Sequence, residues 1–164
     1  MSAAIVLPSL TNWTKNGISA IFRATNQVDF KSAVDGFLSD KAKITLNGVH
    51  VSRADFVNRL QADKFDEEGA VVTFNDSVEV PKDTQSPVTA GSVGLFYNAT
   101  IAEAIEVRDA PVTTQVTASV NVVIDQDPDV PKPAPSPIRG FFDGRRVMEL
   151  NQVSTQGPTP AQNA

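Results

Sequence analysis

The chain has 164 residues, a length typical of one domain. Its 41% hydrophobic and 20% charged residues match ordinary globular proteins, which argues against extensive disorder. The 14 Lys and Arg against 19 Asp and Glu give a net charge of −5, which disfavours nucleic-acid binding because phosphate attraction dominates that affinity. With no cysteine and one histidine, no zinc site of Cys and His is expected, and we predict neither a metal nor a cofactor.

The first residues also bear on location. They contain no Lys or Arg before their apolar residues and break at Pro8, so they do not resemble a signal peptide. No run approaches the roughly 18 apolar residues that a membrane helix needs. These patterns predict a cytoplasmic protein that does not contact a membrane.

Helical spacing dominates the first part of the chain. Large apolar residues recur at helical intervals over 10–24 and again over 27–38. Gly17 lies on the apolar stripe of the first helix and permits close packing there. Asn26 is placed to cap the second helix, and a third helix is predicted to start at Ser52.

A hairpin is predicted over 44–51. Asn47-Gly48 is the strongest short-range signal for a two-residue turn between antiparallel strands. The only histidine then lies on the polar face of the hairpin. The expected register pairs Leu46 with Val49, Ile44 with Val51, and Thr45 with His50.

Beyond Gly69, alternation replaces helical spacing. Strands are predicted over 70–80, 92–107, 112–124 and 145–153. Five prolines between 125 and 137 indicate an extended loop. We expect an extension over 1–9, one domain over 10–153, and a flexible tail over 154–164.

Helices followed by long antiparallel strands predict an α+β fold in which a curved sheet wraps around the N-terminal helices. This order resembles the nuclear-transport-factor-2-like, or SnoaL-like, superfamily over roughly residues 10–153. Four segments are similar to those of small fungal members of that superfamily: 30–37, 90–97, 136–142 and 145–153. The resemblance implies a cone-shaped barrel with an internal pocket. It does not select a function, because the superfamily includes dehydratases, isomerases, cyclases, transport factors and binding modules.

Polar residues on apolar strand faces are the candidates for chemistry. Strict alternation turns Asp76, Tyr97 and Glu103 inward, and we take these as the candidate catalytic residues. A carboxyl group in an apolar pocket suits general acid–base catalysis, and a tyrosine hydroxyl can orient a carbonyl or enolate oxygen. The resemblance implies the same pairing, since ketosteroid isomerase combines a carboxylate with a tyrosine. One β-bulge would instead turn either carboxylate outward.

Two functions follow for the pocket. The favoured one is a dimeric module that binds a small apolar ligand or a partner. The alternative is a cofactor-free dehydratase, isomerase or cyclase that acts on a polyketide-like or steroid-like molecule. An open cavity of at least about 300 Å³ that brings Tyr97 and a carboxylate together would favour the enzyme. The candidate ligand-binding residues, which either wall the cavity or plug it, are Trp13, Phe22, Phe37 and Tyr97.

The outer faces of two neighbouring strands carry no charge. Solvent-facing sheets usually carry Lys or Glu, so a neutral outer face predicts burial against a second copy of the chain. The residues of this expected homodimer face are Phe96, Asn98, Thr100, Thr113, Gln115, Thr117, Ser119 and Asn121.

A basic cluster precedes and begins the last strand. It contains Arg139, Arg145 and Arg146, near Phe141 and Phe142. The cluster can either hold an anionic ligand or cover apolar neighbours while offsetting the acidic surface, and we favour the second interpretation.

Overall fold

A computed structural model describes residues 6–62, 67–107, 110–132 and 142–159, with the backbone alone described at 67–69, 103–107 and 110–112. These residues form three helices and one six-stranded sheet with the strand order β2-β1-β6-β5-β4-β3. The elements in chain order are α1 (Leu10–Arg23), α2 (Gln27–Phe37), β1 (Leu38–Leu46), β2 (Val49–Val51), α3 (Arg53–Ala62), β3 (Glu67–Pro81), β4 (Gly91–Val107), β5 (Ala110–Gln126) and β6 (Arg145–Pro158). The predicted α+β fold is confirmed.

Side-chain caps fix the starts of the helices. Ser9 accepts a hydrogen bond from the backbone of Asn12 at 3.2 Å, and Asn26 accepts one from the backbone of Asp29 at 2.8 Å. Ser52 does the same for Asp55 at 3.0 Å. Each bond satisfies a backbone N–H that has no partner inside its helix. The predicted caps at Asn26 and Ser52 are therefore confirmed.

The hairpin has the predicted register, with Ile44 opposite Val51 and Thr45 opposite His50. Asn47 and Gly48 adopt φ angles of 51° and 82°, the left-handed pair that a two-residue hairpin turn needs. The first strand starts earlier than predicted, at Leu38, because it pairs in parallel with β6. Segment 38–43 carries little strand propensity, so the partner strand determines its conformation.

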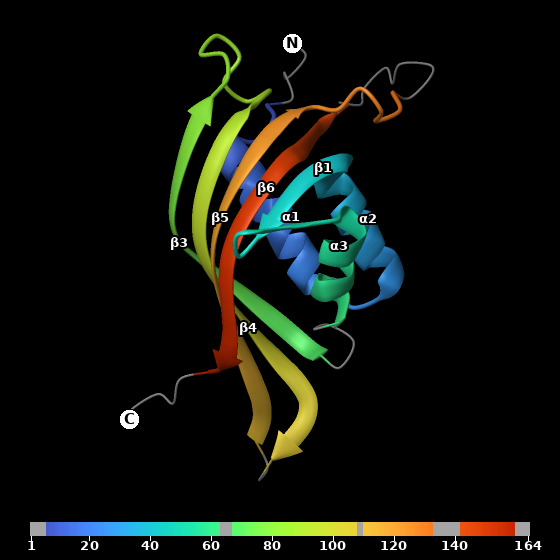
Figure 1. Ribbon diagram of the computed structural model, residues 1–164, viewed down its shortest axis with the longest axis vertical. Coiled ribbons are helices and arrows are strands. Elements are labelled where there is room, and N and C mark those ends of the chain that lie inside the picture. The colour runs from blue at the N-terminus through green and yellow to red at the C-terminus, as the bar shows by residue number, and fades with distance from the viewer. Residues whose placement is uncertain (1–5, 63–66, 108–109, 133–141, 160–164) are drawn as a thin grey trace.

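The sheet curves around the helices, which all lie on its concave side (Figure 1). Alternate residues of β4 and β5 point into this core, as predicted. The strand β6 runs to Pro158, five residues beyond its predicted end, and so includes part of the expected tail. The buried residues of the two central strands are Val93, Leu95, Tyr97, Ala99, Ile101, Ala118, Val120, Val122 and Ile124.

A bulge in β3 overturns part of the predicted alternation. The register with β4 shifts between Phe74 and Asp76, so one extra residue reverses the facing of everything that follows. Strict alternation would place Val78 and Val80 on the inward side with Asp76, but they are 65% and 63% exposed on the opposite side of the sheet. Glu79 turns toward the helices instead and accepts a hydrogen bond from the Thr11 hydroxyl at 2.8 Å.

The interpretation of Arg145 as a residue that covers apolar neighbours from the surface is wrong. Its side chain is 0% exposed and forms an ion pair with Asp143 at 2.9 Å. The guanidinium also donates to the backbone oxygens of Pro8 and Val88, at 2.8 and 3.0 Å. It therefore joins the start of β6 to two distant segments. Arg139 lies outside the described residues.

Candidate functional site

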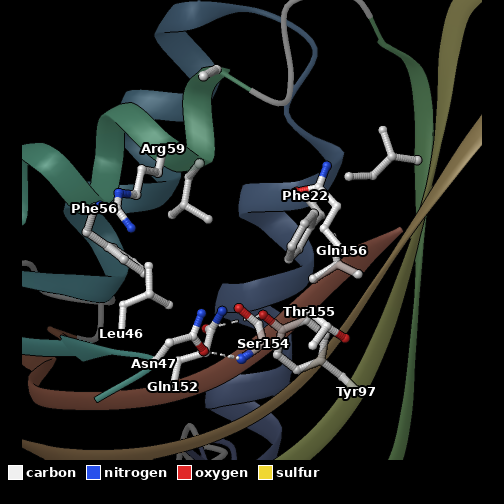
Figure 2. Close-up of a pocket in the computed structure, with 14 residues that line it drawn as sticks. Phe22, Leu46, Asn47, Phe56, Arg59, Tyr97, Gln152, Ser154, Thr155 and Gln156 are labelled. Atoms are coloured by element: carbon white, nitrogen blue, oxygen red, sulfur yellow. Dashed lines mark hydrogen bonds between the residues drawn. The ribbon is translucent and has the colours of Figure 1, made fainter. Parts of the chain in front are cut away.

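A cavity of about 450 Å³ lies between α3, the end of α1 and the concave side of the sheet. Figure 2 shows its lining side chains, with Arg59 and Phe56 on the side of α3 and Tyr97 and Gln152 on the side of the sheet. The apolar part of the wall consists of Phe22, Leu46, Phe56, Leu60, Ala62, Ile101 and Val116. The polar part consists of Asn47, Arg59, Gln152, Ser154, Thr155 and Gln156, with the hydroxyl of Tyr97.

Tyr97 and Gln152 form the buried polar pair of this wall. The Tyr97 hydroxyl donates to the Oε1 atom of Gln152 at 3.4 Å, and both residues are buried. Burial raises the pKa of Tyr97, because the phenolate would lose its hydration. The hydroxyl therefore stays protonated at neutral pH and acts as a hydrogen-bond donor rather than a base.

The hairpin turn contributes Asn47 to the rim. Its side-chain oxygen accepts from the backbone N–H of Ser154 at 2.8 Å, and its own N–H donates to the carbonyl of Gln152 at 2.9 Å. These bonds hold the turn against the end of β6. The position of Asn47 therefore depends on the parallel pairing of β1 with β6, which no local sequence pattern indicated.

The structure brings together two of the predicted ligand-binding residues and separates the other two. Phe22 and Tyr97 line the cavity, and their rings meet edge to face with centroids 6.0 Å apart. Trp13 and Phe37 instead stack on each other with centroids 5.4 Å apart, and neither lines this cavity. They fill the core beside it and leave the cavity open.

The predicted catalytic residues do not meet in the described part of the site. Asp76 is exposed on the other side of the sheet, and its side chain accepts from the backbone N–H of Ser77 at 2.8 Å. Its expected inward placement is wrong because the bulge that follows Phe74 reverses the alternation. Glu103 pairs with Glu67 in the backbone of β4 and β3, but its side chain lies outside the described residues. Of the three, the described lining of the cavity includes Tyr97.

Sequence reasoning did not name Arg59 or Gln152. Gln152 could have been found, because it follows Leu150 by two positions and alternation in β6 turns both toward the core. Arg59 gave no such signal, because a surface arginine on a helix is common. Its role depends on how α3 is placed over the sheet.

The described lining holds one charged side chain, that of Arg59, and neither a carboxylate nor an imidazole. His50 lies exposed on the hairpin with its Nδ1 atom 3.3 Å from the Thr45 hydroxyl, as predicted. Within the described ranges, no three His, Asp or Glu residues cluster as a metal site would require. Such a lining can bind and orient a small molecule, but none of its described side chains is a carboxylate or imidazole that could act as a general base.

No helix among the described residues is both long enough and apolar enough to cross a membrane.

Comparisons with known proteins give similarity in structure alone. No protein-family model matches the chain, and no curated protein matches it in sequence. The solved structure of an NTF-2 like protein of unknown function from Pseudomonas aeruginosa aligns with a TM-score of 0.53 at 7% identity, over 88% of this chain and 94% of the other. This chain has the nuclear-transport-factor-2-like fold.

Two further structures show how widely function varies on the nuclear-transport-factor-2-like fold. The complex of Mtr2 with the Mex67 M domain from Candida albicans aligns with a TM-score of 0.58 at 11% identity, over 93% of this chain and 96% of that chain. A type 2 hexachlorocyclohexane dehydrochlorinase, LinA, aligns with a TM-score of 0.55 at 7% identity, over 92% of this chain and 87% of that chain. At these identities the likeness extends to the fold and no further. The expected likeness to small fungal members stays a prediction.

Proposed function

We propose that this protein is a dimeric module that binds a small ligand in the cavity between α3 and the sheet. The observation that carries the proposal is an open cavity of about 450 Å³ with a mostly apolar wall and a few polar groups. Ligand sites typically combine these features within a volume of about 300–1,000 Å³. The described lining contains no carboxylate or histidine, so we place binding ahead of the alternative of a dehydratase, isomerase or cyclase.

Filling the cavity should weaken ligand binding. We expect N-phenyl-1-naphthylamine, a neutral apolar fluorophore, to bind the wild-type protein with a rise in fluorescence. Val116→Trp and Leu60→Trp place a large side chain in the cavity from opposite walls and should each weaken this binding at least about tenfold, since the indole occupies the ligand's volume. Fluorescence titration measures the affinity.

Ser32→Trp is the control, because Ser32 is exposed on α2 and lines none of the described pockets. Its affinity for the fluorophore should equal that of the wild type. Unchanged binding in both cavity variants, with circular dichroism unchanged, would place the fluorophore elsewhere and contradict the proposal.

The proposed homodimer forms through the open face, by which we mean the side of the sheet opposite the helices. In addition to its neutral polar residues, this face exposes more apolar surface than the sequence predicted, because the bulge in β3 places Val78 and Val80 on it. Ser119 of β5 pairs with Phe96 of β4 on one side and with Val153 of β6 on the other, so the two apolar residues flank it on this face. The outer sides of β4 and β5 are uncharged over 92–102 and 113–123, with Asp76 beside them on β3. This uncharged area and the exposed apolar residues support burial against a second copy.

Charging the open face should separate the dimer. Asn98 and Thr117 face each other across β4 and β5 and share a hydrogen bond of 2.9 Å. We expect the wild type to sediment at twice 17.5 kDa and the double variant Asn98→Lys, Thr117→Lys to sediment as a monomer, since unpaired lysines would be buried at the interface.

The matched control for this double variant carries Asn16→Lys and Ser32→Lys, two exposed positions on the helices. It adds the same charge and should stay dimeric in sedimentation. A lysine variant of the open face that remains a dimer would rule out this interface.

A further inference from the structure

Two amide side chains of the cavity wall, those of Asn47 and Gln152, have engaged oxygens and free NH₂ donors. The amide oxygen of Asn47 is engaged by the Ser154 N–H, and that of Gln152 by the Tyr97 hydroxyl. Neither the Asn47 nor the Gln152 side-chain NH₂ group donates a hydrogen bond to any other described residue. Because Gln152 is only 7% exposed, its NH₂ group can find an acceptor mainly inside the cavity. A ligand that supplies acceptor oxygens would satisfy these donors.

Arg59 adds a positive charge to the same wall. It lies on α3, on the opposite wall of the cavity from Gln152 (Figure 2). No carboxylate of the described part of the chain pairs with its guanidinium. Arg53, six residues earlier on the same helix, pairs with Asp35 at 3.0 Å. Arg59 is thus the cation of α3 that a ligand can reach.

The apolar side chains of the cavity wall suit the apolar part of a ligand. Phe22, Phe56 and Leu60 come from the helices and Ile101 and Val116 from the sheet, so the apolar side chains face one another across the cavity. An apolar chain or ring placed among them would leave water on binding. The charged group would then lie at the rim, where Arg59 is exposed.

We propose that the ligand is an apolar molecule with an acidic headgroup, whose carboxylate pairs with Arg59 while its apolar part fills the cavity. This inference rests on the ligand-binding function proposed above and specifies the chemical class of the ligand. Arginine suits this role because its planar guanidinium can donate two parallel hydrogen bonds to a carboxylate.

Three probes with the same ten-carbon chain test the headgroup: decanoate, decanol and decylamine. Each would displace N-phenyl-1-naphthylamine from the protein at pH 7.5, and the displacement gives its affinity. We expect decanoate to bind about tenfold more tightly than decanol, and decylamine to bind more weakly than both. Added salt should weaken decanoate binding and leave decanol binding nearly unchanged, because the rim is exposed to solvent.

Arg59→Gln tests the assigned contact. This variant should lose the preference and bind decanoate and decanol about equally. Arg23→Gln is the control, since Arg23 is an exposed arginine at the end of α1 that does not line the cavity, and it should keep the preference for decanoate.

Two results would overturn the inference while leaving ligand binding intact. The first is equal affinity of the wild type for decanoate and decanol. The second is a decanoate preference that survives Arg59→Gln. If the fluorophore did not bind the wild type, and isothermal titration calorimetry showed no binding of the three probes, the proposed function and this inference would be overturned together.

Discussion

Replacing Arg145 with methionine should lower the free energy of unfolding by about 3–5 kcal/mol, the typical cost of removing one partner of a buried ion pair. The guanidinium is fully buried and makes two hydrogen bonds to the Asp143 carboxylate, each 2.9 Å long. Methionine has a similar length and is apolar, so the loss would come from Asp143 and from the carbonyls of Pro8 and Val88, which Arg145 satisfies. Urea denaturation measures the change.

Arg23→Met separates the role of burial from the general effect of losing a positive charge. Arg23 is exposed, so its replacement should change the free energy of unfolding by less than about 0.5 kcal/mol. Arg145→Lys keeps the charge but cannot reproduce the two parallel bonds, and it should be destabilised too. If Arg145→Met were as stable as Arg23→Met, the structural role assigned to Arg145 would be wrong.

The same ion pair predicts a dependence of stability on pH. Burial by itself raises the pKa of Asp143, but hydrogen bonds from the Arg145 side chain and backbone outweigh it, so the pKa lies below the ordinary 3.8. The unfolded chain therefore binds this proton more readily than the native protein. The stabilisation from the ion pair is complete when the pH is above the ordinary pKa of 3.8. It disappears as the pH falls through the lower pKa that Asp143 has in the native protein.

Asp143→Asn isolates this contribution, because it removes the titrating group. The difference in unfolding free energy between wild type and Asp143→Asn should be constant near neutral pH and shrink below about pH 4. Urea denaturation across that range measures it. A difference that grew on acidification would contradict the lowered pKa.

Replacing Gly17 with valine should cost about 2–3 kcal/mol of stability, since it overfills a packed core. A Cβ atom at Gly17 would lie 2.3 Å from the ring of Phe37, closer than real Cβ atoms approach other carbons. The Phe37 ring cannot move freely, because it is itself stacked on Trp13. Urea denaturation again gives the change in unfolding free energy.

Gly36→Val is the matched control. Gly36 lies in α2 with nothing within 4 Å of the position of an added Cβ, so valine should leave the stability unchanged or slightly raise it. Phe37→Leu makes room beside Gly17, so Gly17→Val should cost less in that background than in the wild type. Additive costs in the double variant would show that the two residues do not compete for the same space.

Much of the fold was predictable from local patterns. The helix starts at Asn26 and Ser52 and the turn at Asn47-Gly48 depend on interactions within a few residues, and all of them are confirmed. The facing of β4 and β5 followed from simple alternation, which placed Tyr97 in the core. The fold class followed from the order of these elements.

The candidate site was less predictable, since it combines residues whose neighbours are distant in sequence. Asn47 and Gln152 meet because β1 pairs in parallel with β6, and such a pairing leaves little trace in a short polar strand. Asp76 was misplaced because one extra residue in β3 reverses the facing of the residues beyond it. No local signal marked that bulge.

The sequence by itself determined the helices, the hairpin register and the inward faces of the two central strands. Only the tertiary structure decided that Arg145 is buried, that Trp13 and Phe37 fill the core, and that Arg59 reaches an open cavity. The physical reason is the range of the interactions. Caps, turns and alternation act over a few residues, whereas burial and cavity shape depend on the packing of elements far apart in the chain.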